Sequence, residues 1–301
     1  MSTTSTDRLA ELALEPMRLA GPKPGFLQGT RASVREILAH RELLGMLVRR
    51  ELKARYKDSV LGFFWSLMRP LTLLVVYYVA IGEFLNAKDA IPSFAIFVFT
   101  GLTAWALFSE MVQAGTGSII ANAGLVKKVY LPREIFPLAS IGSAFVNFAI
   151  QLGILVVATI VLSEFPLGTR WLYALLALAV IVVYGTALAL ALSAANVYLR
   201  DVQYLVEISL MVLFWASPIV YSWTMVAQRL SGTVWESLYL GNPMTLAVIG
   251  FQEAFWVAGD DIPTLPDLAQ RLGIALAVGL VLVWLAQRTF ARLQSNFAQE
   301  L

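Results

Sequence analysis

Long apolar stretches without charged residues dominate the pattern of this sequence. Residues 90–109, 135–163, 171–199 and 208–228 contain no Asp, Glu, Lys or Arg. Each stretch is long enough to cross a membrane, because about 20 apolar helical residues span a hydrocarbon core of roughly 30 Å. Two shorter stretches, 70–82 and 272–287, reach that length if flanking Arg and Glu side chains extend to the membrane surface.

The pattern therefore predicts an all-α integral membrane protein. It has six predicted transmembrane helices, at residues 64–84, 92–112, 137–161, 171–194, 204–224 and 269–289. An even number of spans places both termini on the same side of the membrane.

Basic residues are concentrated on the side that holds the termini. The segments of that side contain eighteen basic and 12 acidic residues, whereas the segments of the other side contain four basic and eight acidic ones. The two sides thus differ strongly in charge, although the whole chain carries only +2. Because Lys- and Arg-rich segments stay inside, we expect both termini to be cytoplasmic.

Composition excludes several classes of chemistry. Only 14% of residues are charged, against about 25% in soluble domains. The chain has no cysteine and one histidine, His40, which argues against disulfides, thiolate or zinc sites and a Ser-His-Asp triad. It also has no Gly-Lys dipeptide, and so no P-loop for nucleotide hydrolysis. We expect no catalytic residue, no metal, no directly bound cofactor and no nucleic-acid partner.

The segment before the first span divides near residue 31. Residues 1–30 lack the apolar core of a secretory signal, and a Gly- and Pro-rich run at 21–25 predicts a flexible segment. In residues 31–58 apolar residues recur at helical spacing among many basic ones, and Ser33 and Glu36 have the spacing of a capping box. This pattern is typical of a cytoplasmic amphipathic interface helix on the membrane surface. A helix packed on a partner protein is the alternative, and both can hold at once.

The cytoplasmic segment 115–134 is long enough to contain a short helix. Ser118 is a candidate for its start and Gly124 for its end. The pair Lys127-Lys128 is either ordinary positive-inside charge or a contact for a soluble partner, and the spacing favours neither interpretation.

The outer segment 222–268 is long but apolar, so it is not expected to stay free in water. The dipeptide Asn242-Pro243 interrupts it and predicts two short helices, an outer hairpin at 233–258. We expect the hairpin to re-enter the outer leaflet, where its turn has to be buried in protein or line a wet cavity. A hairpin lying on the surface is the alternative.

Polar residues within the spans give weaker signals. The third span carries a polar stripe of Ser140, Asn147 and Gln151, and the fourth has Gly185, Ala189 and Ser193 at four-residue spacing. Both patterns are more typical of helix–helix contacts than of ligand sites. Glu110 and Glu207 fall near predicted span ends, where interfacial placement accounts for them.

Two aromatic pairs are spaced so that each is expected to occupy one helix face. Tyr77 and Phe84, like Phe214 and Tyr221, lie seven residues apart and so are expected to share a helix face. Faces of this kind along a pore would suit the apolar faces of sugar rings. Packing in the core or at the membrane interface is the alternative for each aromatic residue.

Five linked motifs give the sequence a family resemblance. They are residues 50–67 followed by Arg69-Pro70, Asn122 with LVKKVYLPRE at 125–134, YLRDV at 198–202, SPIVY at 217–221 and NPM at 242–244. From about residue 31 to the C-terminus, the chain resembles ABC-2 type permeases that export O-antigen, teichoic acid and related polysaccharides.

The resemblance implies a type V ABC exporter-like fold in which residues 59–301 form the six-helix domain. It implies a homodimer in the bacterial plasma membrane, working with two copies of a separate cytoplasmic ABC ATPase that binds ATP and Mg. Its cargo would be a glycan linked to undecaprenyl or a similar lipid, such as O-antigen, teichoic acid, capsule or a cell-wall galactan, moved to the outer face.

The resemblance and the patterns above also assign residues to sites. ATPase coupling is expected at Arg50, Glu51, Lys53, Asn122, Leu125, Val126, Lys127 and Lys128. The substrate entrance, where a guanidinium would meet a carrier phosphate, is expected at Arg55, Tyr56, Trp65 and Arg69. The predicted translocation path comprises Tyr77, Phe84, Asn147, Gln151, Phe214 and Tyr221, and the predicted outer gate comprises Trp235, Asn242 and Pro243.

Two other functions stay open on sequence grounds. A drug or small-lipid exporter permease has the same fold, and neighbouring genes for sugar metabolism or for drug response would distinguish the cargo. A membrane-embedded glycosyl or phosphoryl transferase belongs to a different class. Activity of the purified chain without any ATPase would identify it.

Overall fold

The computed structural model describes residues 26–56, 64–129, 131–162, 165–166 and 168–301, and all regular structure in these residues is helical. The longer helices are α2 (Phe26–Ala39), α3 (Arg41–Tyr56), α4 (Phe64–Tyr77), α6 (Phe94–Ala121), α8 (Ile135–Val161), α9 (Arg170–Tyr198), α10 (Val202–Trp215), α13 (Pro243–Phe255) and α14 (Leu268–Leu293). The shorter ones are α5 (Ala87–Ala90), α7 (Ala123–Lys128), α11 (Trp223–Leu230), α12 (Val234–Leu240) and α15 (Phe297–Glu300). Most of the predicted flexible segment 1–30 lies outside the described residues.

Within the described residues, four helices are long and apolar enough to cross a membrane: α6, α8, α9 and α14 with its C-terminal extension. They correspond to the second, third, fourth and sixth predicted spans. α10 is shorter than predicted, because it ends at Trp215. α4 is followed directly by a π-helical segment, Tyr78–Glu83.

The segment that follows the second predicted span also differs from expectation. α6 continues to Ala121, because its pattern of buried residues extends through Ser118 and Ile119. Ser118 therefore lies inside α6 and does not start a separate helix. The short helix α7 contains Gly124 and so does not end there.

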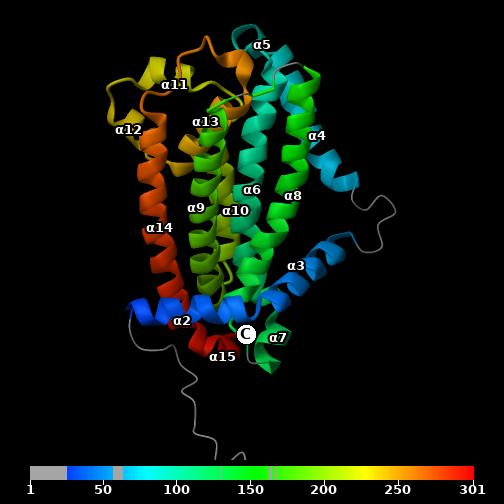
Figure 1. The fold of residues 1–301 in the computed structure, drawn as a ribbon, viewed down its shortest axis with the longest axis vertical. Coiled ribbons are helices and arrows are strands. Elements are labelled where there is room, and N and C mark those ends of the chain that lie inside the picture. Colours follow the sequence, from blue (N-terminus) through cyan, green and yellow to red (C-terminus); the bar gives the residue numbers. More distant parts are fainter. Residues whose placement is uncertain (1–25, 57–63, 130, 163–164, 167) are drawn as a thin grey trace, which may run out of the picture.

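α9 lies at the centre of the bundle, where it packs against α6, α13 and α14 (Figure 1). A Cβ atom added to Gly115 of α6 would lie only 2.5 Å from the Cβ of Ala189, and one added to Gly185 would lie 2.8 Å from Met111 Cε. Small residues thus let the two backbones approach closely, which favours association where lipid offers no hydrophobic driving force. The predicted helix–helix contact of the fourth span is confirmed.

Two helices, α2 and α3, replace the single amphipathic helix predicted before the first span. They meet at His40, whose Nδ1 lies 2.8 Å from the carbonyl oxygen of Glu36. α2 begins at Phe26, earlier than the predicted start at residue 31, so Ser33 lies well inside the helix. The predicted capping box is therefore wrong, and the Ser33 side chain instead accepts a hydrogen bond from Gln287 of α14.

Different short or amphipathic helices lie at the two ends of the bundle. Figure 1 shows α2, α3, α7, α15 and the C-terminus at one end, and α5, α11 and α12 at the other. α3 packs closely on α8. A Cβ atom added to Gly142 of α8 would lie only 2.7 Å from Val48 Cγ2 of α3. The basic helices α2 and α3 therefore lie at the end that the charge distribution predicts to be cytoplasmic.

The division of the outer hairpin at Asn242-Pro243 is confirmed. Asn242 caps α13 by accepting a hydrogen bond from the Met244 amide at 3.0 Å, and Pro243 occupies the first turn, where its missing N–H costs nothing. α13 is largely buried against α9 and α6. Side chains of α13 also bind the non-helical segment after α10, since Gln252 Nε2 donates to the Pro218 carbonyl at 2.7 Å.

The close contact of α6 with α9 predicts different costs for two glycine substitutions. Gly115→Ala places a methyl group against Ala189 and should destabilise the protein by about 1–3 kcal/mol, the usual cost of overpacking. Gly153→Ala on α8 is the matched control, because its added Cβ meets no atom within 4 Å. Thermal unfolding in detergent should show a lower Tm for the first variant only; equal Tm values would contradict the contact.

Candidate functional site

Polar side chains of α3 bind two neighbouring helices, α6 and α8. Arg50 donates a hydrogen bond to Asn122 Oδ1 at the end of α6, and Ser140 Oγ of α8 donates to Glu51 Oε1 at 3.2 Å. Arg55 NH1 lies 2.6 Å from Glu110 Oε1 of α6. We call this set of contacts the α3 junction. It consists of Arg50, Glu51, Arg55, Glu110, Asn122, Ser140 and Asn147.

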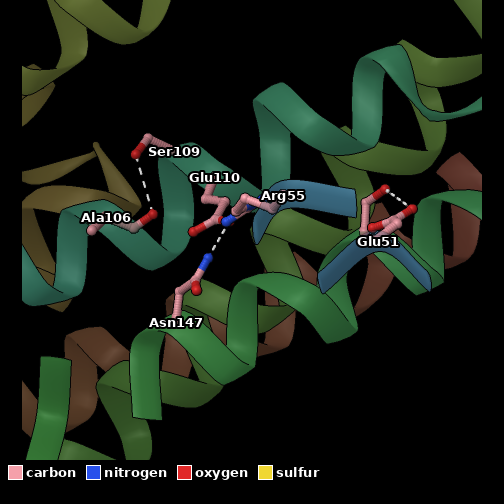
Figure 2. Close-up of polar contacts among 7 residues, drawn as sticks. Glu51, Arg55, Ala106, Ser109, Glu110 and Asn147 are labelled. Atoms are coloured by element: carbon pink, nitrogen blue, oxygen red, sulfur yellow. Dashed lines mark hydrogen bonds and ion pairs between the residues drawn. The ribbon is translucent and has the colours of Figure 1, made fainter. Parts of the chain in front are cut away.

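Glu110 joins α3 to two long helices at once (Figure 2). Its Oε1 accepts a second hydrogen bond, from Asn147 Nδ2 of α8 at 2.7 Å. Sequence reasoning missed this role, because it placed Glu110 at a span end. Since α6 continues to Ala121, Glu110 lies in the interior of a long helix, where an ionised side chain requires partners.

The second carboxylate of the α3 junction, that of Glu51, has a pKa that is set mainly by burial. Burial raises the pKa of Glu51, and this effect outweighs the hydrogen bond from Ser140 and the charges of Arg50 and Arg55, which lower the pKa. Glu51 and Arg55 lie one turn apart and therefore face the same side of α3. Four of the predicted coupling and path residues, Arg50, Glu51, Asn122 and Asn147, are thus brought together with Arg55.

The predicted coupling residues of α7 divide by exposure. Val126 is buried in an apolar cluster that includes Leu47 of α3 and Phe297 of α15, so it holds α7 in place. Lys127 and Lys128 are exposed, as is Lys53 of α3. The exposed lysines can meet a partner, whereas Val126 acts inside the protein.

The predicted entrance residues are not gathered into one site. Arg55 belongs to the α3 junction, whereas Trp65 and Arg69 are exposed on α4. The side chain of Tyr56 and the connection 57–63 lie outside the described residues.

Part of the predicted translocation path forms a hollow lined by α4, α6 and α10. The rings of Tyr77 and Phe214 stack with their centroids 5.8 Å apart, and Trp105 meets Phe214 edge-on at 5.7 Å. These rings line an open hollow of about 510 Å³, which also contains Ser109, Gln113 and Glu207. Aromatic faces beside hydrogen-bonding groups are a surface to which a sugar ring can bind. The sequence suggested Tyr77 and Phe214, but neither Trp105 nor the polar neighbours.

Two predicted path residues lie elsewhere. Phe84 is 79% exposed, because the π-helical segment after Tyr77 has more residues per turn and rotates Phe84 off the face of Tyr77. Tyr221 does not extend the face of Phe214, because α10 ends at Trp215 and Tyr221 Oη folds back to donate to the Trp215 carbonyl at 2.7 Å. The expectation that each pair shares a helix face is therefore wrong.

The polar stripe of α8 packs inside the protein. Gln151 is buried, and its Oε1 has no hydrogen-bond partner among the described residues. Asn147 instead lies in the α3 junction. The two residues predicted for the path on this helix are therefore not part of the aromatic hollow.

The predicted gate residues occupy the outer end. Asn242 Nδ2 donates to Ser217 Oγ at 3.4 Å, which links the start of α13 to the SPIVY segment. Pro243 occupies the first turn of α13, and Trp235 is exposed on α12.

Long apolar helices, close helix contacts through small residues and a basic amphipathic pair at one end define a multi-pass membrane protein. The chain belongs to the ABC-2 type transporter family, whose sequence profile matches residues 42–256.

Relatives named as export or transport proteins are similar along most of the chain. The O-antigen export system permease protein RfbA of Myxococcus xanthus is 32% identical over 270 residues, which covers 89% of this chain and 98% of the relative. RfbA of Klebsiella pneumoniae is 26% identical and covers 86% of this chain and 95% of the relative. The polysialic acid transport protein KpsM of Escherichia coli is 22% identical over 68% of this chain and 78% of its own.

The geometry of Glu110 predicts graded effects of substitution. Glu110→Gln keeps an acceptor for Asn147 but removes the ion pair with Arg55, which should cost only about 0.5–1 kcal/mol because Arg55 is 41% exposed to solvent screening. Glu110→Ala also leaves Asn147 without this acceptor and should cost more. Thermal unfolding of both variants in detergent tests the order; a Glu110→Ala variant as stable as Glu110→Gln would contradict it.

Glu134, which directly precedes α8, predicts a pH dependence of stability. Burial raises its pKa from the ordinary value of 4.5 despite hydrogen bonds to Gln287 and Ser33. The folded state therefore holds this proton more tightly than the unfolded state, and stability declines as the pH rises through the raised pKa. As the pH rises above the ordinary value of 4.5, the Tm of Glu134→Gln should fall less than that of the wild type; parallel curves would contradict this assignment.

Proposed function

We propose that the chain is the permease subunit of an ABC exporter that moves a lipid-linked cell-surface polysaccharide outward across the plasma membrane. The observation that carries the proposal is the similarity to O-antigen export permeases over almost their whole length. The lack of a P-loop fits a subunit that depends on a separate ATPase for ATP and Mg. No feature of the described residues favours a drug exporter or a transferase over this function.

Six spans are proposed, with both termini in the cytoplasm. Four of the spans are the long apolar helices. The other two are α4 with its π-helical segment and α10. α10 has 14 residues and so extends about 21 Å, and the segment after it completes the crossing. Its carbonyl groups bind side chains of α13, as at Thr245 with Ala216 and Gln252 with Pro218. Such bonding supports a hairpin that re-enters the outer leaflet and acts as a gate, because lipid cannot bind these groups.

The ATPase is proposed to bind at the end that carries α3 and α7. Lys53, Lys127 and Lys128 are exposed there and form a surface for a cytoplasmic partner. Movement of α3 would pass to α6 and α8 through Arg50, Glu51 and Arg55. The basic face of α2 and α3 also suits anionic membrane lipid.

The glycan is proposed to pass through a homodimer. The aromatic hollow is open on one side, so a second copy is needed to enclose a path. The exposed Arg69 of α4 is proposed to meet the phosphate of an undecaprenyl or similar carrier at the entrance, whereas Arg55 is held by Glu110 in the α3 junction. O-antigen, capsule, teichoic acid and cell-wall galactan are the proposed cargo classes, with O-antigen-like glycans supported by the relatives' names.

One complementation experiment tests both cargo and coupling. Depletion of the chain should cause the lipid-linked glycan to accumulate in the cytoplasm, and the wild type should reverse this. Lys127→Glu/Lys128→Glu should not reverse it and should weaken ATPase binding at least about tenfold, because reversed charges cost more than 1.4 kcal/mol at such a contact.

The matched control is Arg229→Glu, an exposed charge reversal on α11 at the opposite end of the bundle. It should leave both ATPase binding and export intact. Normal glycan levels on depletion would contradict the cargo, whereas normal export by the double lysine variant would contradict the coupling surface.

A further inference from the structure

A buried hydrogen-bond hub joins three elements near α2. The side chain of Gln287 on α14 is 8% exposed, and the neighbouring Glu134 is 3% exposed. Gln287 Nε2 donates to Glu134 Oε1 at 2.8 Å and to Ser33 Oγ of α2 at 3.0 Å. Its Oε1 accepts from Arg288 Nε at 2.7 Å and from Thr30 Oγ1 of α2 at 3.5 Å. We call this the Gln287 hub.

The hub uses the full bonding capacity of the amide. A glutamine side chain has two N–H donors and two acceptor lone pairs, and Gln287 has four partners for them. Buried polar networks that are fully satisfied hold their members rigidly, whereas loss of one partner leaves the others with a desolvation cost. Removal of the Gln287 amide would deprive the buried Glu134 of a donor.

α2 depends on this hub for its position. Thr30 and Ser33 on its partly buried side bind Gln287, whereas its apolar residues Val34 and Leu38 are exposed and face away from the bundle. α3, in contrast, has the separate attachments of the α3 junction. The two helices meet at His40 and lie at the same end of the bundle (Figure 1).

The family match does not account for the hub. Both α2 and Gln287 lie outside residues 42–256, the part matched by the ABC-2 profile. Glu134, the other buried residue of the hub, lies within residues 42–256. The hub therefore ties the part of the chain that defines the family to elements near the two ends of this chain.

We infer that Gln287 is a positioning residue for coupling to the ATPase. It fixes α2 to the start of α8 and to α14, so that displacement of α2 moves both long helices as one unit. The attachment of α2 follows from the geometry alone, whereas its role in coupling rests on the proposed function.

An exchange of the two side chains tests the attachment. Gln287→Glu puts a carboxylate against Glu134 and should release α2. Combined with Glu134→Gln it should restore α2, because the amide introduced at position 134 would then donate to the new carboxylate, and Ser33, Thr30 and Arg288 can all donate as well. Thr289→Ala is the control on the same helix, since among the described residues its hydroxyl binds only the local Leu285 carbonyl at 3.0 Å.

A single spin label reports the result, because the chain has no cysteine of its own. A nitroxide on Val34→Cys should become more mobile in Gln287→Glu, and should regain its wild-type spectrum in the double variant. A nitroxide on Met46→Cys of α3 should not respond to either change. An unchanged Val34 spectrum in Gln287→Glu, or a double variant that stays mobile, would overturn the attachment.

Reconstitution with the partner ATPase tests the coupling role. Gln287→Glu should hydrolyse ATP while exporting at least about fivefold less glycan per ATP, the low end of usual coupling energies, and the double variant should recover the wild-type ratio. An unchanged ratio would overturn the coupling role. A wild type without ATP-driven export would instead refute the proposed function, while the spin-label spectra would still decide the attachment.

Discussion

Lipid offers no hydrogen-bond partner, so a backbone polar group at membrane depth has to find one inside the protein. The described residues follow this constraint in several ways. Thr103 and Thr116 of α6 donate to carbonyl groups one turn earlier, at 2.8 and 2.7 Å. The non-helical segment after α10 receives side-chain bonds from α13. Glu110 is held by Arg55 and Asn147 from two other helices. Polar residues whose partners lie on other elements, such as Glu110, Thr245 and Gln252, are consequently the positions at which separate elements are joined.

The same constraint explains what the sequence could predict. Charge-free stretches require helices, so the four long helices were placed correctly, and small residues at four-residue spacing identified the contact of α9 with α6. The Asn242-Pro243 dipeptide has a strong local preference, and its division of the hairpin was predicted for the same reason. Each of these sequence signals reflects either a local backbone preference or the burial of one helix face, and both are visible in a short stretch of sequence.

The remaining features depend on contacts between distant residues. The π-helical segment after Tyr77 has no marked sequence signal, yet it rotates Phe84 away from the hollow. The early end of α10 depends on bonds from α13, which lies later in the chain. The role of Glu110 depends on the length of α6, and the role of Ser33 on Gln287, which lies 254 positions away. Periodicity alone cannot identify such partners.

Residues that share one predicted role divide into two physical kinds. Arg50, Glu51 and Asn122 have fixed partners within the protein, so they can transmit movement but have little freedom to bind an ATPase. Lys53, Lys127 and Lys128 are exposed, so they can contribute to docking. Exposed ion pairs contribute little energy individually, whereas satisfied buried contacts hold helices rigidly. Under the proposed function, the lysines would govern how fast and how selectively the ATPase binds, and the α3 junction would determine how much of its movement reaches the long helices.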